Sequence, residues 1–423
     1  MRHFLLVLTA ASSLALSASL PAKAVRTPEQ VAMAALSAAP VWDGHNDVPE
    51  QLRDRRKNLL AGFNFADTAN TADAAKGVNA MHTDLKRSKA GHLGAQFWSV
   101  YVSADLTEPQ AVQATLEQID VTRRLIAMYP ADMQYCETAD CTVKAMKAGK
   151  LASLIGMEGG HSIGGSLAVL RQLYALGARY MTLTHFKNTA WADSATDAPK
   201  AGGLTPFGKD VVREMQRLGM LVDLSHVAEK TMMDAMAVAG APVIFSHSNA
   251  RALNNHPRNA SDAVLDRLKV NGGVIMINFY PGYVVGDTRA WNVRRAGEKA
   301  RIEAQHIGDP DRAKAELAAW EKANPIPNGS LIDVANHLDH IARRIGADHV
   351  GLGGDFDGID RGVAGLEDVS RYPALFVELA RRGWSQADLQ KLSSGNTMRV
   401  LRAAEAYAAA HKGDAPIENA VSF

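Results

Sequence analysis

Cysteine is scarce in this chain, and charge of neither sign is in excess. Cys136 and Cys141 are the only two cysteines among 423 residues, which excludes a zinc site built from several thiolates. Their spacing permits a small disulfide loop in an oxidising compartment but does not require one. The 46 Lys and Arg residues nearly balance the 45 Asp and Glu residues, giving a net charge of +1. This balance argues against binding to nucleic acid or to an anionic membrane surface.

An apolar run near the N-terminus indicates a secretory signal. The chain opens with "MRHFLLVLTAASSLALSASLPAKA", a basic start, an apolar stretch and then a small-x-small cleavage site. We expect residues 1–24 to be a signal peptide and residues 25–423 to be one periplasmic or secreted domain. An uncleaved anchor is the alternative, disfavoured by the serine content and marginal length of the run. No cysteine lies near the cleavage site and the C-terminal "HKGDAPIENAVSF" is polar, so no stable membrane anchor is expected after cleavage.

Strand-like apolar runs recur along the chain, and most are followed by a segment with helical periodicity. This alternation is typical of parallel βα units, and eight such runs match the count of a (β/α)8 TIM barrel. The alternative is a doubly wound open sheet, which normally has a Gly-rich phosphate turn after the first strand, and "DGHND" is not such a turn. The runs are residues 40–45, 94–102, 150–160, 178–185, 219–226, 241–247, 272–280 and 349–357.

The segments between these runs carry ordinary helix signals. Thr205 can cap a helix, Pro206 suits its first turn, and Gly219 can end it. Gly177 and Gly272 are similar stop signals for two other helices. These signals place the helices between the strands, as a barrel requires.

One charged segment, residues 282–329, departs from the regular alternation of strand-like runs and helical segments. Its composition favours helix, and it is long for a link between a strand and the next helix. We expect a surface insertion with some character of a lid over the site.

Polar residues follow most of the strand-like runs. In a barrel, the carboxyl ends of the strands face a common site, so these side chains are expected to converge there. Three of the 14 histidines in the chain end the fourth, fifth and sixth runs. The residues at the strand ends are His45, Asp47, Glu158, His185, His226, His247, Tyr280, Asp355 and Asp357.

Five of these residues form a nitrogen and oxygen ligand set that suits Zn2+ or another first-row divalent ion. A single histidine at a strand end is more often structural than a ligand, so the prediction depends on the whole set. His45 and Asp47 are one residue apart and would share a face of a strand, because side chains alternate with period two. The set could hold two metal ions with Glu158 as the bridge. Its members are His45, Asp47, Glu158, His226 and His247.

Two metal ions that share a water predict hydrolysis, because they supply a hydroxide nucleophile at neutral pH and polarise a carbonyl. Asp355 is then the expected proton handler, and Asp357 is interpreted as structural. His185 is expected to donate to the developing oxyanion. Arg258 precedes a helix and could clamp a substrate carboxylate, although a surface ion pair explains it equally well. Tyr280 is a further candidate for substrate binding.

The other histidines are interpreted as structural. His82, His92, His161 and His256 lie off the strand ends or beyond them. The remaining group is placed on solvent-facing helices: His306, His337, His340 and His411.

The residues from about Val41 to Arg402 resemble the membrane (renal) dipeptidases, zinc-dependent enzymes on a (β/α)8 barrel. The resemblance is carried, in order, by "DGHND", "GAQFWSVY", "SLIGMEGGHSIGGSLAVLRQLYALGARYMTLTHFKNTAWADS", "LTPFG", "DLSH", "PVIFSHSNAR", "RN", "GGDFDG", "GLEDVSRYP" and "GNTMRV".

This resemblance implies a role for each candidate residue. One zinc would be held by His45 and Asp47 and the other by His226 and His247, with Glu158 between the two ions. His185 and Arg258 would bind the substrate, and Asp355 would handle its amino end and the proton. The resemblance also implies a homodimer and hydrolysis of dipeptides, some with a C-terminal D-residue.

Two other functions compete with a dipeptidase. A related amidohydrolase would act on N-acyl amino acids, lactams or lactones, but that class often opens with His-x-His and bridges its metals with a modified lysine. Here the opening is His-x-Asp and no lysine ends the third or fourth run. A secreted binding protein that had lost its chemistry would lack a ligand, and none is missing.

Overall fold

The structure, a computed structural model, describes Met1 and residues 26–420. The expected signal peptide therefore lies outside the described residues, apart from Met1. Within the described part of the chain, every helix is too short or too polar to cross a membrane.

Eight parallel strands form a closed barrel, which confirms the expected (β/α)8 fold. The hydrogen-bonded order is β2-β1-β9-β8-β7-β6-β5-β4, and β2 also pairs with β4 to close the ring. That closing contact runs over seven residue pairs, from Ala95–Ala152 to Tyr101–Glu158. The strands are β1 (Val41–Asn46), β2 (Leu93–Tyr101), β4 (Leu151–Glu158), β5 (Ala178–Thr182), β6 (Leu221–Asp223), β7 (Ile244–Phe245), β8 (Val274–Ile277) and β9 (Val350–Leu352).

An additional short strand, β3 (Met133–Tyr135), pairs with the first residues of β4. Cys136 follows it directly and forms a disulfide with Cys141. The disulfide that the sequence permitted is therefore present, and it fixes the turn between β3 and the next helix.

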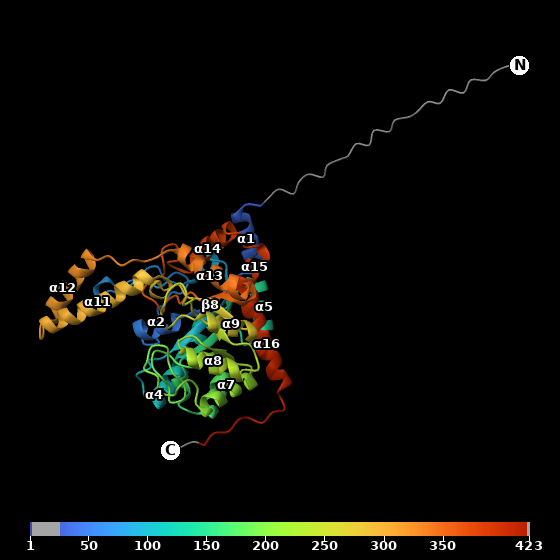
Figure 1. Cartoon of the computed structure of the whole chain (residues 1–423), viewed down its shortest axis with the longest axis horizontal. Coiled ribbons are helices and arrows are strands. Elements are labelled where there is room, and N and C mark those ends of the chain that lie inside the picture. The colour runs from blue at the N-terminus through green and yellow to red at the C-terminus, as the bar shows by residue number, and fades with distance from the viewer. Residues whose placement is uncertain (2–25, 421–423) are drawn as a thin grey trace.

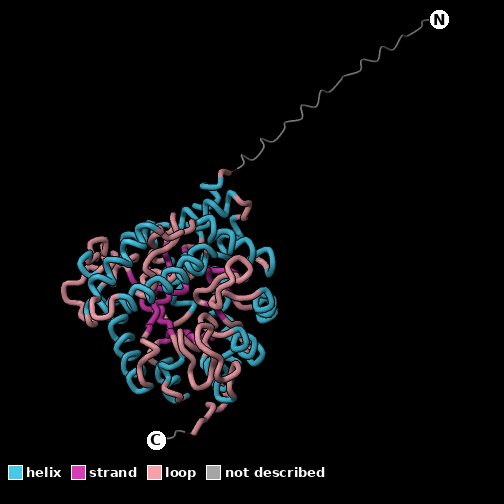
Figure 2. Tube along the Cα trace, turned by 60° about the vertical axis from the view of Figure 1, so that its left-hand side comes forward, coloured by secondary structure: helices cyan, strands magenta, loops and turns pink. Residues whose placement is uncertain are grey.

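Helices surround the strands on the outside, as Figure 2 shows. The start and stop signals of the sequence are confirmed in α7, where the Thr205 side chain accepts a hydrogen bond from the Gly208 amide and Gly219 has a φ of 86°. The helices are α1 (Pro28–Ala38), α2 (Val48–Arg56), α3 (Leu85–Ala90), α4 (Glu108–Met128), α5 (Ala139–Lys147), α6 (Leu167–Ala175), α7 (Pro206–Leu218), α8 (Glu229–Val238), α9 (Asp262–Asn271), α10 (Pro281–Val284), α11 (Gly286–Gln305), α12 (Pro310–Ala323), α13 (Leu331–Ile345), α14 (Tyr372–Arg381), α15 (Gln386–Gln390) and α16 (Asn396–Ala410).

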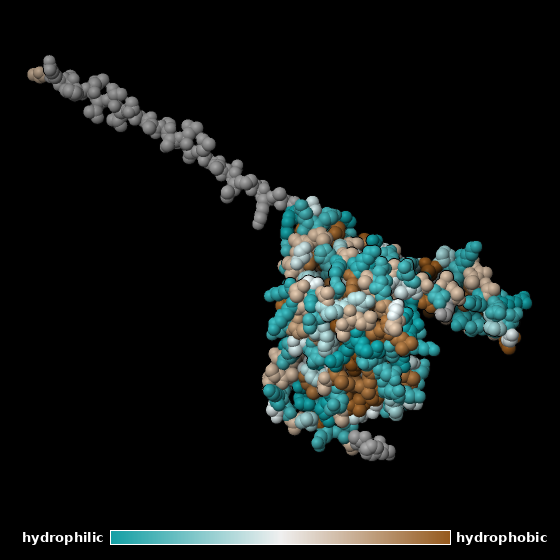
Figure 3. All heavy atoms as spheres, turned by 180° about the vertical axis from the view of Figure 1, so that it is seen from behind, coloured by the Kyte–Doolittle hydropathy of each residue, from teal (hydrophilic) through white to brown (hydrophobic). Residues whose placement is uncertain are grey.

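The unusual segment after β8 contains α10 and then a helical hairpin, α11 and α12, that we call the arm. Figures 1 and 3 show the arm standing clear of the barrel. Its two helices are held together near the base, where the Trp291 indole donates to the Asn324 carbonyl at 2.7 Å and Arg295 pairs with Glu321. No residue of α11 or α12 lines the cavity at the strand ends.

Aromatic rings fill the interior of the barrel below the strand ends. The rings of Trp42 and Phe97 lie 5.6 Å apart, and Phe97 lies 5.0 Å from Tyr180. A Cβ atom on Gly156 would lie 2.0 Å from the Tyr180 ring, so a side chain at this position does not fit. Interiors at this packing density tolerate no extra methyl group without moving their neighbours.

Replacement of Gly156 by alanine is expected to lower the free energy of unfolding by about 1–3 kcal/mol, because the added methyl overpacks the barrel against Tyr180. Denaturant unfolding measures the change. Gly297→Ala is the matched control, since Gly297 lies in the middle of α11 and a Cβ there meets nothing within 4 Å. A Gly156→Ala protein as stable as the control would contradict the packing argument.

His337 corrects one sequence expectation, because it is buried and not solvent-facing. It lies on α13 with 1% exposure. Its Nδ1 accepts a hydrogen bond from the Ala250 amide at 3.1 Å, and its Nε2 lies 3.0 Å from the Val284 carbonyl. The neutral imidazole satisfies both partners, and burial lowers the pKa of His337 to about 4.

His337 therefore predicts a loss of stability in mild acid. Its pKa is lower in the folded chain than in the unfolded chain, so its contribution is full above pH 6.5 and is lost as the pH falls toward 4. The total is on the order of 3 kcal/mol, at about 1.4 kcal/mol for each pKa unit. In unfolding experiments at several pH values, His337→Gln is expected to lose less stability than the unmodified chain over this interval. An equal loss of stability in His337→Gln and in the unmodified chain would contradict this role of His337.

Candidate metal centre

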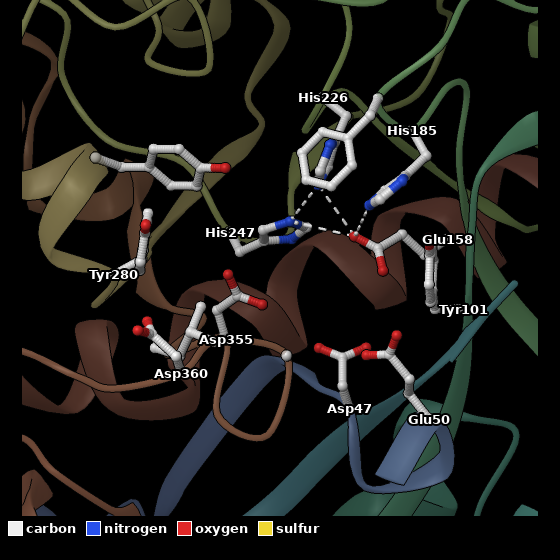
Figure 4. Close-up of a pocket in the computed structure, with 14 residues that line it drawn as sticks. Asp47, Glu50, Tyr101, Glu158, His185, His226, His247, Tyr280, Asp355 and Asp360 are labelled. Carbon is white, nitrogen blue, oxygen red and sulfur yellow. Dashed lines mark hydrogen bonds and ion pairs between the residues drawn. The ribbon is translucent and has the colours of Figure 1, made fainter. Parts of the chain in front are cut away.

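A cavity of about 300 Å³ opens at the carboxyl ends of the barrel strands. It contains seven of the nine residues that were predicted to bind metal, bind substrate or take part in the reaction, and Figure 4 shows how they face one another. His45 and Arg258 are not on the cavity wall but lie directly behind it. The seven are Asp47, Glu158, His185, His226, His247, Tyr280 and Asp355.

Glu158 lies at the centre of this group, at the end of β4. One of its oxygens, Oε1, lies 3.1 Å from His226 Nε2 and 3.4 Å from His247 Nε2. The other oxygen, Oε2, lies 3.5 Å from His45 Nε2. Glu158 is only 4% exposed. Its two oxygens therefore face separate sets of nitrogen donors, the geometry expected of a bridging carboxylate.

His45 and Asp47 meet in the way the sequence predicted, but for a different reason. His45 lies within β1, whereas Asp47 follows the strand and precedes α2. The turn of the chain at Asp47 still brings its Oδ2 to 3.3 Å from His45 Nε2. Asp355 approaches the same nitrogen, at 3.9 Å.

The donor atoms of the cavity fit divalent metal ions. Three overlapping groups have all their ligand atoms within 4.8 Å of one another: His45, Glu158 and His247; Glu158, His185 and His226; and His45, Asp47 and Asp355. Two of these buried atoms, His45 Nε2 and Asp47 Oδ1, have no hydrogen-bond partner. His226 Nε2 and His247 Nε2 lie only 2.9 Å apart. Buried polar atoms without partners are costly, and a shared cation would satisfy them.

Hydrogen bonds behind the ligands orient the imidazole rings. The Tyr180 hydroxyl lies 2.8 Å from His45 Nδ1, and the Ser246 hydroxyl lies 2.8 Å from His247 Nδ1. Each contact engages the outer nitrogen of the ring and leaves Nε2 to face the cavity. Metal-binding histidines are commonly held in this way.

Two buried aspartates that were not predicted as site residues form hydrogen bonds between neighbouring strand ends. Asp223 accepts hydrogen bonds from the hydroxyls of Thr182 at 2.5 Å and Ser246 at 2.6 Å, and so connects β5, β6 and the residue before His247. Asp43 accepts from the amides of His45 at 2.7 Å and Gly354 at 2.8 Å. Asp43 precedes His45 by only two residues, and this closeness was the available signal.

The backbone is strained at three site positions. His226, Asp355 and Asp357 have φ values of 67°, 61° and 69°, in the left-handed region that favours glycine. Such strain is retained where the surrounding structure enforces it, often at functional sites. Asp357 also accepts a hydrogen bond from the His82 amide at 2.7 Å, which agrees with the structural role expected of it.

The expected proton handler, Asp355, and the expected oxyanion donor, His185, have opposite pKa shifts. Burial, together with the charges of Asp47 and Glu158, raises the pKa of Asp355 to about 8, although His45 acts to lower this pKa. The Asp355 Oδ2 accepts a hydrogen bond from Asn278 at 2.8 Å. Burial lowers the pKa of His185 to about 4, so this imidazole is neutral near pH 7.

Arg258 is buried, with 1% exposure, and is not part of a surface ion pair. Its guanidinium donates to the His247 carbonyl at 3.2 Å and lies 5.2 Å from the centre of the Tyr283 ring. No carboxylate among the described residues lies within 4.0 Å of it. A cation with these surroundings is available to an anionic group that enters beside Tyr283.

The family model of the membrane dipeptidases (peptidase family M19) matches residues 29–414, which is most of the chain. The chain belongs to the membrane dipeptidase family. As a member, it is a metal-dependent dipeptidase, in agreement with the resemblance on which the sequence expectations relied.

Three similar proteins show how far this likeness extends. The dipeptidase tcpJ of Claviceps purpurea is 41% identical over 389 residues, which cover 90% of this chain and 80% of that protein. The probable dipeptidase PvdM from Pseudomonas aeruginosa is 24% identical, with a TM-score of 0.76 over 90% of this chain and 99% of that one. A metallo peptidase from Rhodobacter sphaeroides is also 24% identical, with a TM-score of 0.69 over 86% of this chain and 99% of that one.

Sequence reasoning missed several residues that line the dipeptidase cavity. Glu50 lies on α2, and Tyr101 ends β2 opposite Glu158. Tyr283 lies on α10, three residues after Tyr280. Glu50 follows Asp47 by three residues, the spacing that places two side chains on one side of a helix, so a signal for it was present.

Replacement of Glu158 by glutamine is expected to remove bound metal and to lower dipeptidase activity. The loss is expected to exceed the roughly 10–100-fold loss that follows replacement of a residue that only supports a metal ligand. Metal content after gel filtration and the hydrolysis rate measure the two effects. Glu214→Gln is the matched control, because Glu214 is equally buried but pairs with Arg171 and Arg217 outside the cavity. Full metal content in Glu158→Gln would overturn the bridging assignment.

Proposed function

We propose that this dipeptidase holds two zinc ions, with His45 and Asp47 on one side of Glu158 and His226 and His247 on the other. The observation that carries the proposal is the placement of Glu158, whose two oxygens face separate donor groups. When bound, two such ions would supply a hydroxide nucleophile at neutral pH and polarise the peptide carbonyl.

The chain's own residues supply the proton and the hydrogen bonds of the reaction. Asp355 lies on the cavity wall with a pKa raised to about 8, so it can carry a proton to the leaving amine near neutral pH. His185 is neutral, and its Nε2 lies 3.7 Å from Glu158, where it can donate to the oxygen of the reacting carbonyl. Tyr280 closes the opposite wall of the cavity.

Two side chains, Asp355 on the cavity wall and Arg258 behind it, would set the length of the substrate. Asp355 would receive the free amino group, and the buried Arg258 would receive the free carboxylate beside Tyr283. A substrate that satisfies both ends has two residues, which supports hydrolysis of free dipeptides.

We further propose that dipeptides with a C-terminal D-residue are accepted. The similar metallo peptidase from Rhodobacter sphaeroides was solved with a phosphinate mimic of the dipeptide L-Ala-D-Ala. The two chains share the fold, and this ligand motivates the proposal.

Location and assembly are also proposals. The basic and apolar N-terminus and the Cys136–Cys141 disulfide support an exported protein, because disulfides persist in oxidising compartments. A periplasmic or secreted homodimer without a stable membrane anchor is the form that we propose.

A panel of dipeptides with L- and D-residues at the C-terminal position tests the function. Free dipeptides are expected to be hydrolysed, with activity lost on chelation and restored by Zn2+. N-acetylated and amidated copies are expected to react at least about tenfold more slowly, because each lacks one terminal charge. Preferred cleavage of the acetylated copies would instead favour an amidohydrolase that acts on N-acyl amino acids.

A further inference from the structure

Glu50 is an acidic side chain of the cavity that the proposed reaction does not use. It lies on α2, one helical turn after Asp47, and lines the cavity beside it (Figure 4). It is half-buried and, unlike Asp47, Glu158 and Asp355, has no hydrogen-bond or ion-pair partner among the described residues. The charged groups that influence it most are all acidic: Asp47, Asp54, Glu158 and Asp355.

The cavity wall carries no positive side chain near Glu50. Among the described residues, no lysine or arginine lines the cavity, and the buried Arg258 contacts Tyr283 and the His247 carbonyl. Burial and the acidic neighbours raise the pKa of Glu50 to about 9, so a cationic group that enters beside it would favour its ionised form. An uncompensated carboxylate at the wall of a cavity favours a cationic ligand group.

The position of Glu50 indicates which end of a dipeptide it faces. Figure 4 shows Glu50 beside Asp47 and Tyr101, across the cavity from Tyr280, whose ring lies 4.9 Å from that of Tyr283. Arg258, proposed for the carboxylate end, contacts His247 and Tyr283 instead. Tyr101 also lies on the cavity wall and is influenced by Glu50, so its ring is available to pack against an aliphatic stem.

We propose that Glu50 selects dipeptides whose N-terminal residue has a long cationic side chain, such as lysine or arginine. This inference rests on the proposed dipeptidase function and adds the substrate class to it. The methylene stem packs against Tyr101, and the terminal cation pairs with Glu50. A half-buried pair of this kind discriminates against a neutral side chain of the same length.

The test compares Lys-Ala with norleucine-Ala, which has a similar stem without the charge, and with Glu-Ala. For the unmodified enzyme, kcat/KM for Lys-Ala is expected to exceed that for norleucine-Ala by about tenfold, which corresponds to about 1.4 kcal/mol. Glu-Ala is expected to be the poorest substrate. In Glu50→Gln the ratio of Lys-Ala to norleucine-Ala is expected to fall toward one.

Asp54→Asn is the matched control, because it removes the same charge from the same helix at an exposed position one turn later. The control is expected to keep the preference. A ratio that does not change in Glu50→Gln overturns the inference. An equal loss on all three substrates, accompanied by loss of metal, also overturns it and assigns Glu50 to support of the metal ligands.

A binding measurement separates this inference from the proposed function. If no dipeptide is hydrolysed, the proposed function fails, and calorimetric titration with Lys-Ala and norleucine-Ala still tests Glu50. Tighter binding of Lys-Ala that is lost in Glu50→Gln supports cation selection. Equal binding of the two dipeptides overturns it.

Discussion

The negative charge of Glu158 is the constraint around which the site is arranged. Burial alone would raise the pKa of this carboxyl, but His45 and His185 hold it well below its usual range. The same carboxylate is the last residue of β4 in the register that closes the barrel, where it pairs with Tyr101. The pairing that closes the barrel therefore also positions the Glu158 carboxylate, and a shift in that register would move it away from the surrounding histidines.

Precision at the strand ends depends on a second layer of buried polar groups. Several barrel strands are very short, and β7 contains only Ile244–Phe245. Backbone pairing between the strands therefore does little to position the residues that follow them. Asp223 and Asp43 extend the order past the strands by accepting hydrogen bonds from neighbouring chain segments. Supporting groups of this kind limit the freedom of the ligands and reduce the reorganisation needed for chemistry.

Much of this arrangement was predictable from sequence, because apolar runs followed by helical patterns identified the eight barrel strands, and parallel strands present their carboxyl ends at one face. The meeting of His45 and Asp47 was predicted from strand alternation, although a turn produces it. The burial of Arg258 could not be predicted, since the loop that carries it has no periodicity. His337 was misplaced because the strongly amphipathic helix α13 gives no sign of which polar residue lies under a loop. Glu50 was not predicted as a site residue because the candidates were taken from the strand ends, and Glu50 lies on the helix that follows β1.

The arm leaves and rejoins the barrel at nearly the same place. Thr288 at its start donates a hydrogen bond to the Pro327 carbonyl, and Ser330 then pairs with Ala364 beside the barrel. An excursion whose two ends are already joined adds little loop entropy when its length changes. The arm can therefore change in length or surface residues during evolution without a change in the register of the barrel strands. The outer shape of the enzyme and its active site can then diverge at different rates.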